Sequence, residues 1–172
     1  HASSMSYGVG SKIEKTARYF QLGEITVQTK KVVFALNGYA QQSKEFIAEL
    51  ESLQDFETVI IAPEGLNRFY AKGFVGKPVA AWMTSEDREH EILDYINYLN
   101  ALYDQLIPPS YTGRIVVLGF SQGVATASRW IHHSLHRFTD FIICSGDIAV
   151  ELRNPLSEKI CALRCCYISG ND

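Results

Sequence analysis

A serine between two glycines is the residue of this chain that is best placed for nucleophilic chemistry. Gly119-Phe120-Ser121-Gln122-Gly123 follows the pattern G-x-S-x-G and comes directly after an apolar run that ends at Leu118. Between a strand and a helix, this pattern forms a sharp, strained turn that exposes the serine hydroxyl. The glycines allow the two backbones to approach closely. The predicted chemistry is attack of Ser121 on a carbonyl carbon, with formation of an acyl-serine.

An acyl-transfer serine also needs two N–H donors for the negative charge that develops on the carbonyl oxygen. The residue after the nucleophile supplies one of them, here the backbone N–H of Gln122. A loop after an earlier strand supplies the other, and Leu36-Asn37-Gly38-Tyr39 stands in that place in the chain order. We therefore predict the second donor to be the N–H of Tyr39, beside the flexible Gly38.

The elements that must position these residues follow from the hydrophobic pattern. Short β-branched or apolar runs predict strands, most of them buried on both faces. The alternating stretch Glu24–Thr29 predicts an additional half-exposed strand. The buried strands are predicted at Lys31–Leu36, Thr58–Ala62, Arg114–Leu118, Phe141–Cys144 and Leu163–Ser169.

Longer stretches between these runs have the period of a helix. Helices are predicted over Gln42–Gln54, from an N-cap at Thr84 to about Leu106, and from about Val124 to His136. The Gly-rich, aromatic stretch Glu64–Trp82 is predicted to be a loop at the ligand-bearing edge of the sheet. Its candidate site residues are Glu64, Arg68, Tyr70, Lys72 and Trp82.

Alternation of strands and helices predicts an α/β fold, with a mainly parallel central sheet and helices on both faces. Ligands of such sheets bind at the carboxyl ends of the strands. The 172 residues suit one domain, with residues 1–10 as a disordered or tag-derived start.

The composition excludes several classes of function. Apolar residues make up 47% of the chain and charged residues 20%, with a net charge of -3 and no basic run, so nothing favours nucleic acid as a partner. No apolar run reaches the roughly 20 residues of a transmembrane segment. The cysteines have no zinc-site spacing and are predicted to be small apolar residues of buried strands, as free thiols in a reducing cytoplasm. They are Cys144, Cys161, Cys165 and Cys166.

From about Val32 onward, the chain resembles the phospholipase/carboxylesterase group of α/β-hydrolases, which includes acyl-protein thioesterases. The motifs that carry the resemblance are Leu36-Asn37-Gly38-Tyr39, Ala62-Pro63, Ala81-Trp82, Gly119-Phe120-Ser121-Gln122-Gly123, Cys144-Ser145-Gly146 and Ser169-Gly170-Asn171-Asp172. Members of this group usually have Leu-His-Gly in the first motif, where this chain has Asn37.

The resemblance implies an α/β-hydrolase fold and hydrolysis of a carboxylic ester or thioester, without metal or organic cofactor. Its substrate would be a small-molecule ester or acyl compound; the oligomeric state is not implied. Ser121 would be the nucleophile, and Tyr39 and Gln122 would supply the oxyanion N–H groups. Gly38 and Trp82 would belong to the substrate site, with Trp82 lining the acyl site or packing beneath it. By position, Phe69 and Phe74 would add apolar walls.

The resemblance also implies an acid and then a histidine after the serine. Asp172 is the candidate acid, with the next residue and Asp147 as alternatives, but no histidine follows. The five histidines are expected on helix faces or at the terminus, at His1, His90, His132, His133 and His136.

Two explanations for the missing base compete. The favoured one is a chain that continues past Asp172, with the histidine and the last strand and helix of the fold, because a sheet edge would otherwise be left unfinished. The other is an inactive relative that binds ligand. A flavodoxin-like cofactor domain is disfavoured, because Asn37-Gly38-Tyr39 lacks the Gly, Ser and Thr of a phosphate-binding loop.

Overall fold

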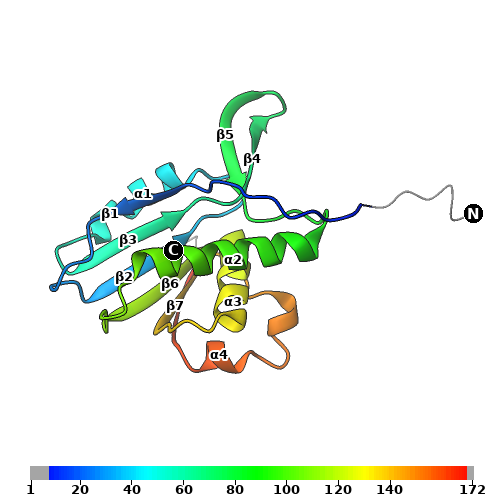
Figure 1. Cartoon of the computed structure of the whole chain (residues 1–172). Coiled ribbons are helices and arrows are strands. Elements are labelled where there is room, and N and C mark those ends of the chain that lie inside the picture. The colour runs from blue at the N-terminus through cyan, green and yellow to red at the C-terminus, as the bar shows by residue number, and fades with distance from the viewer. Residues whose placement is uncertain (1–7, 170–172) are drawn as a thin grey trace, which may run out of the picture.

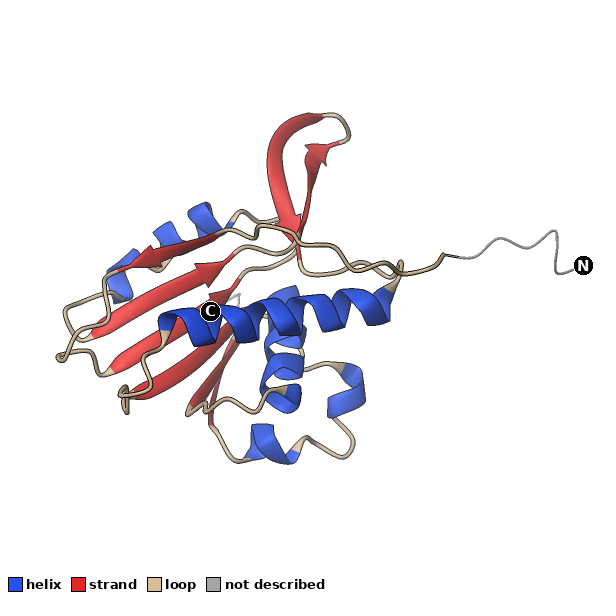
Figure 2. Ribbon diagram, in the orientation of Figure 1, coloured by secondary structure: helices blue, strands red, loops and turns tan. Residues whose placement is uncertain are grey.

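The computed structural model describes residues 8–169, which form one central sheet with helices on both faces (Figures 1 and 2). The sheet has six strands in the order β1-β3-β2-β6-β7-β8. All neighbouring strands are parallel except β1, which runs antiparallel to β3. The mainly parallel α/β architecture that the sequence predicts is therefore confirmed.

The bounds of the elements agree with most of the predicted ones. The strands of the sheet are β1 (Tyr19–Leu22), β2 (Lys31–Leu36), β3 (Thr58–Pro63), β6 (Arg114–Phe120), β7 (Asp140–Cys144) and β8 (Arg164–Ile168). The α-helices are α1 (Ser43–Glu49), α2 (Arg88–Leu106), α3 (Gln122–His133) and α4 (Glu158–Cys161), with short 3-10 turns at Glu51–Leu53 and Val150–Leu152.

Two hydrophobic clusters hold the layers together. The larger one joins one face of the sheet to α2 and α3, and Phe34, Tyr95, Trp130 and Phe141 are fully buried within it. The smaller one joins the opposite face to α1 through Phe46 and Ile47. The alternate residues of β2 point into these two clusters, which explains why that strand is almost continuously apolar.

The prediction of a strand at Glu24–Thr29 is wrong. Those residues form a loop with a turn at its tip, and the outer strand of this region is Tyr19–Leu22, paired with Leu22 opposite Ile60. Thr29 folds back instead, because its Oγ1 accepts the N–H of Thr26 at 2.9 Å. Alternation of polar and apolar residues was therefore not sufficient to locate the strand.

The prediction of a loop over Glu64–Trp82 is also wrong. Most of it is a two-stranded antiparallel hairpin, β4 (Asn67–Lys72) and β5 (Val75–Ala81), which projects from the carboxyl edge of the sheet (Figure 2). Gly73, with a φ of 63°, lies in the turn of the hairpin, and Gly76, with a φ of 98°, lies near the start of β5.

Helix α2 begins later than predicted. Its N-cap is Asp87, with a φ of 51°, and Thr84 forms a turn ahead of it in which Oγ1 accepts the N–H of Glu86 at 3.3 Å. The end at Leu106 agrees with the prediction.

The cysteines are not buried as predicted. Cys144 is half-buried, and Cys161, Cys165 and Cys166 are exposed. The reason is that β8 is the outer strand of the described sheet and all of its residues are exposed, while Cys161 lies at the end of the short helix α4.

Candidate active site

Ser121 occupies a strained turn between β6 and α3. Its φ and ψ angles are 54° and -118°, in a region that L-residues rarely adopt. Its N–H donates to the carbonyl of Cys144 at 3.0 Å, and its own carbonyl accepts the N–H of Val124 at 3.0 Å. These bonds hold the strained backbone in place and leave the serine side chain exposed. The sharp turn between strand and helix that the motif predicts is therefore present.

Small residues around Ser121 are required by close backbone contacts. A Cβ on Gly119 would lie 2.6 Å from the carbonyl oxygen of Gly123. A Cβ on Gly123 would collide with the carbonyl oxygen of Leu36, and one on Gly146 would collide with that of Ser121. The strand ends β2, β6 and β7 therefore meet at the serine without any side chain between them.

The predicted oxyanion loop after β2 lies against the serine. A Cβ on Gly38 would be 3.3 Å from the Cβ of Ser121, so nothing larger than hydrogen fits freely there. The loop is closed by its own amides: Asn37 Nδ2 donates to the carbonyls of Gly38 at 2.8 Å and Gln41 at 3.1 Å. The N–H of Gly38 donates to Gln41 Oε1 at 3.0 Å. Asn37 thus shapes the loop where the resembled family usually has histidine.

The sequence predicts two backbone donors for an oxyanion, one on the residue after Gly38 and one on the residue after Ser121. Within residues 8–169, the N–H groups of Tyr39 and Gln122 have no hydrogen-bond acceptor. Gln122 is the first residue of α3, where helix N–H groups have no partner inside the helix. Such free donors are what an oxyanion site requires.

Trp82 and the side chain of Gln122 join the hairpin to this site. Trp82 is 1% exposed, and its indole N–H donates to the carbonyl of Asn37 at 3.0 Å. The amide of Gln122 accepts the N–H of Trp82 at 3.1 Å and donates to the carbonyl of Met83 at 2.9 Å. Gln122 and the loop that contains Tyr39 are therefore both tied to the residues that follow β5, Gln122 through its side chain and the loop through Asn37.

The remaining residues of the stretch 64–82 take separate positions. Phe69 packs its ring on Tyr39, with the ring centroids 5.4 Å apart. Phe74, expected as an apolar wall, lies at the hairpin tip and is 97% exposed. Glu64 is buried and forms ion pairs with Arg18 and Arg68 at 2.7 and 2.6 Å.

No histidine of the described chain reaches Ser121. His90 binds Asp87 at 2.7 Å at the start of α2. His132, in the last turn of α3, binds Ser157 at 2.7 Å. His136, which comes after this helix, binds Asp104 at 3.2 Å. Burial lowers the pKa of His133, which packs edge-on against His132. His90, His132 and His133 lie on helices, as expected, whereas His136 lies in the loop after α3. None of their hydrogen bonds within residues 8–169 involves Ser121.

The candidate acid Asp172 lies outside the described residues. The alternative Asp147 is exposed and follows Gly146, in the loop after β7. His1 also lies outside the described range, as do the first seven residues of the predicted start.

Other kinds of site find no support in residues 8–169. No group of three or more His, Cys, Asp or Glu side chains there is arranged to hold a metal ion. No helix of that part of the chain has the length and apolar character needed to cross a membrane.

Comparison with known proteins supports the architecture. No family model and no curated protein matches the sequence. Among solved structures, esterase PE8 is similar over 91% of this chain and 90% of its own, with a TM-score of 0.64 and 16% identity. An acyl-protein thioesterase 2 of Zea mays is similar over 86% and 68%, with a TM-score of 0.60 and 21% identity. A carboxylesterase of Nitrososphaera gargenis is similar over 76% and 42%, with a TM-score of 0.53 and 17% identity.

The fold is that of the α/β-hydrolases. The shared architecture puts the serine turn at the carboxyl ends of the parallel strands, where ligands of such sheets bind.

The sequence does not predict two features of this region: the contacts of the Gln122 side chain, and the pairing of Arg88 and Arg129 with one carboxylate. The side chain of Gln122 binds Trp82 and Met83, which directly follow a hairpin that the sequence pattern predicts to be a loop. Gly146 was visible within the Cys144-Ser145-Gly146 motif, which follows a strand neighbouring that of the serine.

Proposed function

We propose that this protein is a serine hydrolase that cleaves a carboxylic ester or thioester through an acyl-Ser121 intermediate. The observation that carries the proposal is the strained turn at Ser121, which Gly38 contacts closely, together with free N–H groups on the next residues, Tyr39 and Gln122. An ordinary turn between strand and helix needs neither a positive φ at serine nor a second loop in contact with it.

In the proposed reaction, Ser121 Oγ attacks the carbonyl carbon and gives its proton to a general base. The oxygen that becomes negative accepts hydrogen bonds from the N–H groups of Tyr39 and Gln122. The alcohol or thiol leaves with a proton, and water then cleaves the acyl-serine to the carboxylic acid. The overall reaction converts the ester or thioester and water to a carboxylic acid and an alcohol or thiol, and it needs no cofactor.

The general base of this mechanism has to come from outside residues 8–169, because the described histidines are held elsewhere. Asp172 is proposed as the acid that orients it, with Asp147 as the alternative. Gly38 and Trp82 are proposed for the substrate side: the missing side chain of Gly38 allows the loop to lie against Ser121, and Trp82 holds the loop through its hydrogen bond to Asn37.

The finer assignment, a phospholipase/carboxylesterase-like enzyme acting in the cytoplasm, is part of the proposal. Its support is the likeness in fold to an esterase and an acyl-protein thioesterase, together with the matching motifs. The substrate would be a small acyl compound and not a nucleic acid.

The test is hydrolysis of p-nitrophenyl butanoate and of a butanoyl thioester by the wild type and Ser121→Ala. We expect activity on at least one of them and a loss of about a thousandfold or more in the variant. Equal rates for wild type and variant would contradict the proposal.

A second candidate function is ligand binding without catalysis. The observation that favours it is that every histidine of the described chain has a partner or position away from Ser121. This candidate predicts that acyl compounds bind but are not turned over, so saturable binding without product would support it.

A further inference from the structure

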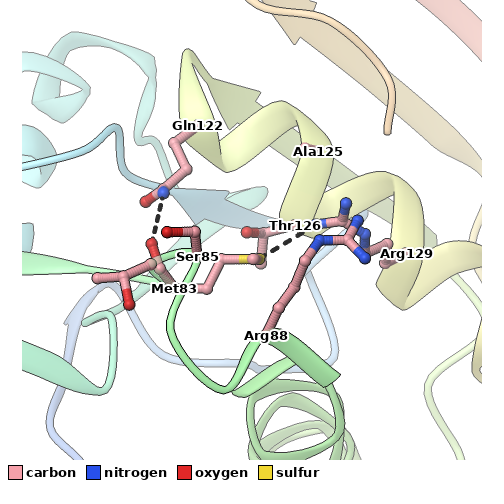
Figure 3. A pocket seen from close by; sticks show the side chains of 8 residues that line it. Met83, Ser85, Arg88, Gln122, Ala125, Thr126 and Arg129 are labelled. Atoms are coloured by element: carbon pink, nitrogen blue, oxygen red, sulfur yellow. Dashed lines mark hydrogen bonds between the residues drawn. The ribbon is translucent and has the colours of Figure 1, made fainter. Parts of the chain in front are cut away.

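A pocket of about 390 Å³ lies next to the candidate active site (Figure 3). One wall is the connection from β5 to α2 and the start of α2; the other is one face of α3. The lining residues are Met83, Thr84, Ser85, Arg88, Gln122, Ala125, Thr126 and Arg129. Since Gln122 is the neighbour of Ser121 and a proposed oxyanion donor, the pocket begins where the reacting carbonyl would lie.

Two guanidinium groups face this pocket and share one carboxylate. Arg129, with a side chain 7% exposed, donates from Nε to Glu151 Oε1 at 2.6 Å. Arg88 lies 3.6 Å from Glu151 Oε2. No other carboxylate of the described chain pairs with either arginine, so the group has a net charge of about one positive unit.

The state of the shared carboxylate is fixed by its partners. The hydrogen bond from Arg129 lowers the pKa of Glu151 and outweighs the opposing effect of burial. Glu151 is therefore ionised near neutral pH, and the remaining positive charge is not removed by a proton on that side chain. The other contacts of Arg129 are uncharged, namely Tyr95 Oη at 3.2 Å and Met83 Sδ at 3.4 Å.

The pocket wall also carries two hydroxyl side chains, those of Thr126 and Ser85. Thr126 is 1% exposed and interacts with the hydroxyl of Tyr95, which also binds Arg129. Ser85 lies across the pocket, with its hydroxyl toward Gln122 (Figure 3).

We propose that this pocket binds a singly charged oxyanion on the substrate, a carboxylate or a phosphodiester, at Arg88 and Arg129. Arg129 lies eight residues after Ser121, which is about 12 Å along the axis of α3. The anion would therefore sit several bonds from the ester that reacts, and the preferred substrates would be acyl compounds with an acidic group at a distance. This inference rests on the proposed function for its substrate, but the binding of the anion does not.

The first experiment measures binding without catalysis. The side-chain Nε–H signals of the arginines are followed by NMR while monomethyl glutarate, dimethyl phosphate or neutral dimethyl glutarate is added. We expect saturable shifts of the Arg88 and Arg129 signals with the anions and none with the neutral diester, and about tenfold weaker binding in Arg88→Gln. The preferred anion identifies the source of the charge. The matched control is Arg164→Gln, because Arg164 is 78% exposed and lies on β8.

The second experiment measures selectivity in hydrolysis. The kcat/KM for mono-p-nitrophenyl glutarate is divided by that for p-nitrophenyl pentanoate, and we expect this ratio to fall about tenfold in Arg88→Gln but not in Arg164→Gln. If both esters are cleaved with an unchanged ratio and no anion binds, the pocket proposal is overturned and the hydrolase proposal stands. If the anions bind as expected and neither ester is cleaved, the anion site is supported and the hydrolase proposal fails.

Discussion

The indole N–H of Trp82 donates to the backbone carbonyl of Asn37 at 3.0 Å, which joins the end of β5 to the loop after β2. These residues are 45 positions apart in the chain. Gly38, the next residue, lies against Ser121, and Tyr39 after it has a free N–H within the described residues. A fully buried side chain thus fixes the backbone of a candidate oxyanion site that it does not itself enter.

Trp82→Phe tests this relationship. The variant keeps an aromatic ring but loses the hydrogen bond, so the loop is less firmly held. We expect the free energy of unfolding to fall by about 1–2 kcal/mol and the rate of reaction with a fluorophosphonate to fall about tenfold.

The matched control is Trp130→Phe. Trp130 is also fully buried and its indole N–H also has one acceptor, Asn100 Oδ1 at 2.9 Å, but it lies away from the serine turn. A similar loss of stability with an unchanged labelling rate is expected there. Equal loss of labelling in both variants would show that Trp82 acts only through general stability.

Gly38→Ala tests the contact between the loop and the nucleophile. The new methyl group would lie 3.3 Å from Ser121 Cβ and from the Phe120 carbonyl oxygen, so the loop must move by a few tenths of an ångström. We expect about a tenfold slower reaction with the fluorophosphonate and less than about 1 kcal/mol of lost stability. Gly8→Ala is the control, because nothing lies within 4 Å of a Cβ there. An unchanged labelling rate in Gly38→Ala would show that this loop does not contribute to the reaction of Ser121.

Asp140→Asn tests an ion pair at the start of β7. Asp140 is 7% exposed and accepts hydrogen bonds from Arg114 Nη2 at 2.6 Å and Thr139 Oγ1 at 2.6 Å. Burial alone would raise the pKa of this carboxyl, but the bonds from Arg114 and Thr139 outweigh it and hold the pKa below its ordinary value.

A carboxyl group with a lower pKa in the folded chain adds stability above its unfolded pKa of about 3.9, and this is lost as pH falls through the folded value. We expect Asp140→Asn to lose about 2 kcal/mol at pH 7, less than a fully buried pair would, because Arg114 is half exposed. The deficit should shrink as pH falls below about 4. Urea denaturation at several pH values measures this loss of stability, with Asp94→Asn, on the exposed face of α2, as the control. A loss that does not change with pH would contradict a stabilising ion pair at Asp140.

The buried strands could be predicted because burial on both faces requires a continuous run of apolar residues. β2, β3, β6 and β7 are covered on both faces, so they are continuously apolar, and the Ser121 motif follows directly from one of them. The hairpin β4–β5 could not be found in this way. Most of its residues are exposed and it contains Gly76 and Pro78, which are typical of loops.

The pocket could not be predicted for a different reason. Arg88 and Arg129 are 41 residues apart on two helices, and each alone has the pattern of a solvated helix face. Only the packing of α3 beside the connection from β5 to α2 brings them to the same carboxylate, Glu151.

The measurement that tests the central claim most directly is intact mass spectrometry of the protein before and after exposure to a fluorophosphonate. The account predicts a single adduct in the wild type and none in Ser121→Ala, with both proteins showing the same unfolding transition. A wild type that remains unmodified, or an adduct of equal yield in Ser121→Ala, would contradict the assignment of Ser121 as an activated nucleophile.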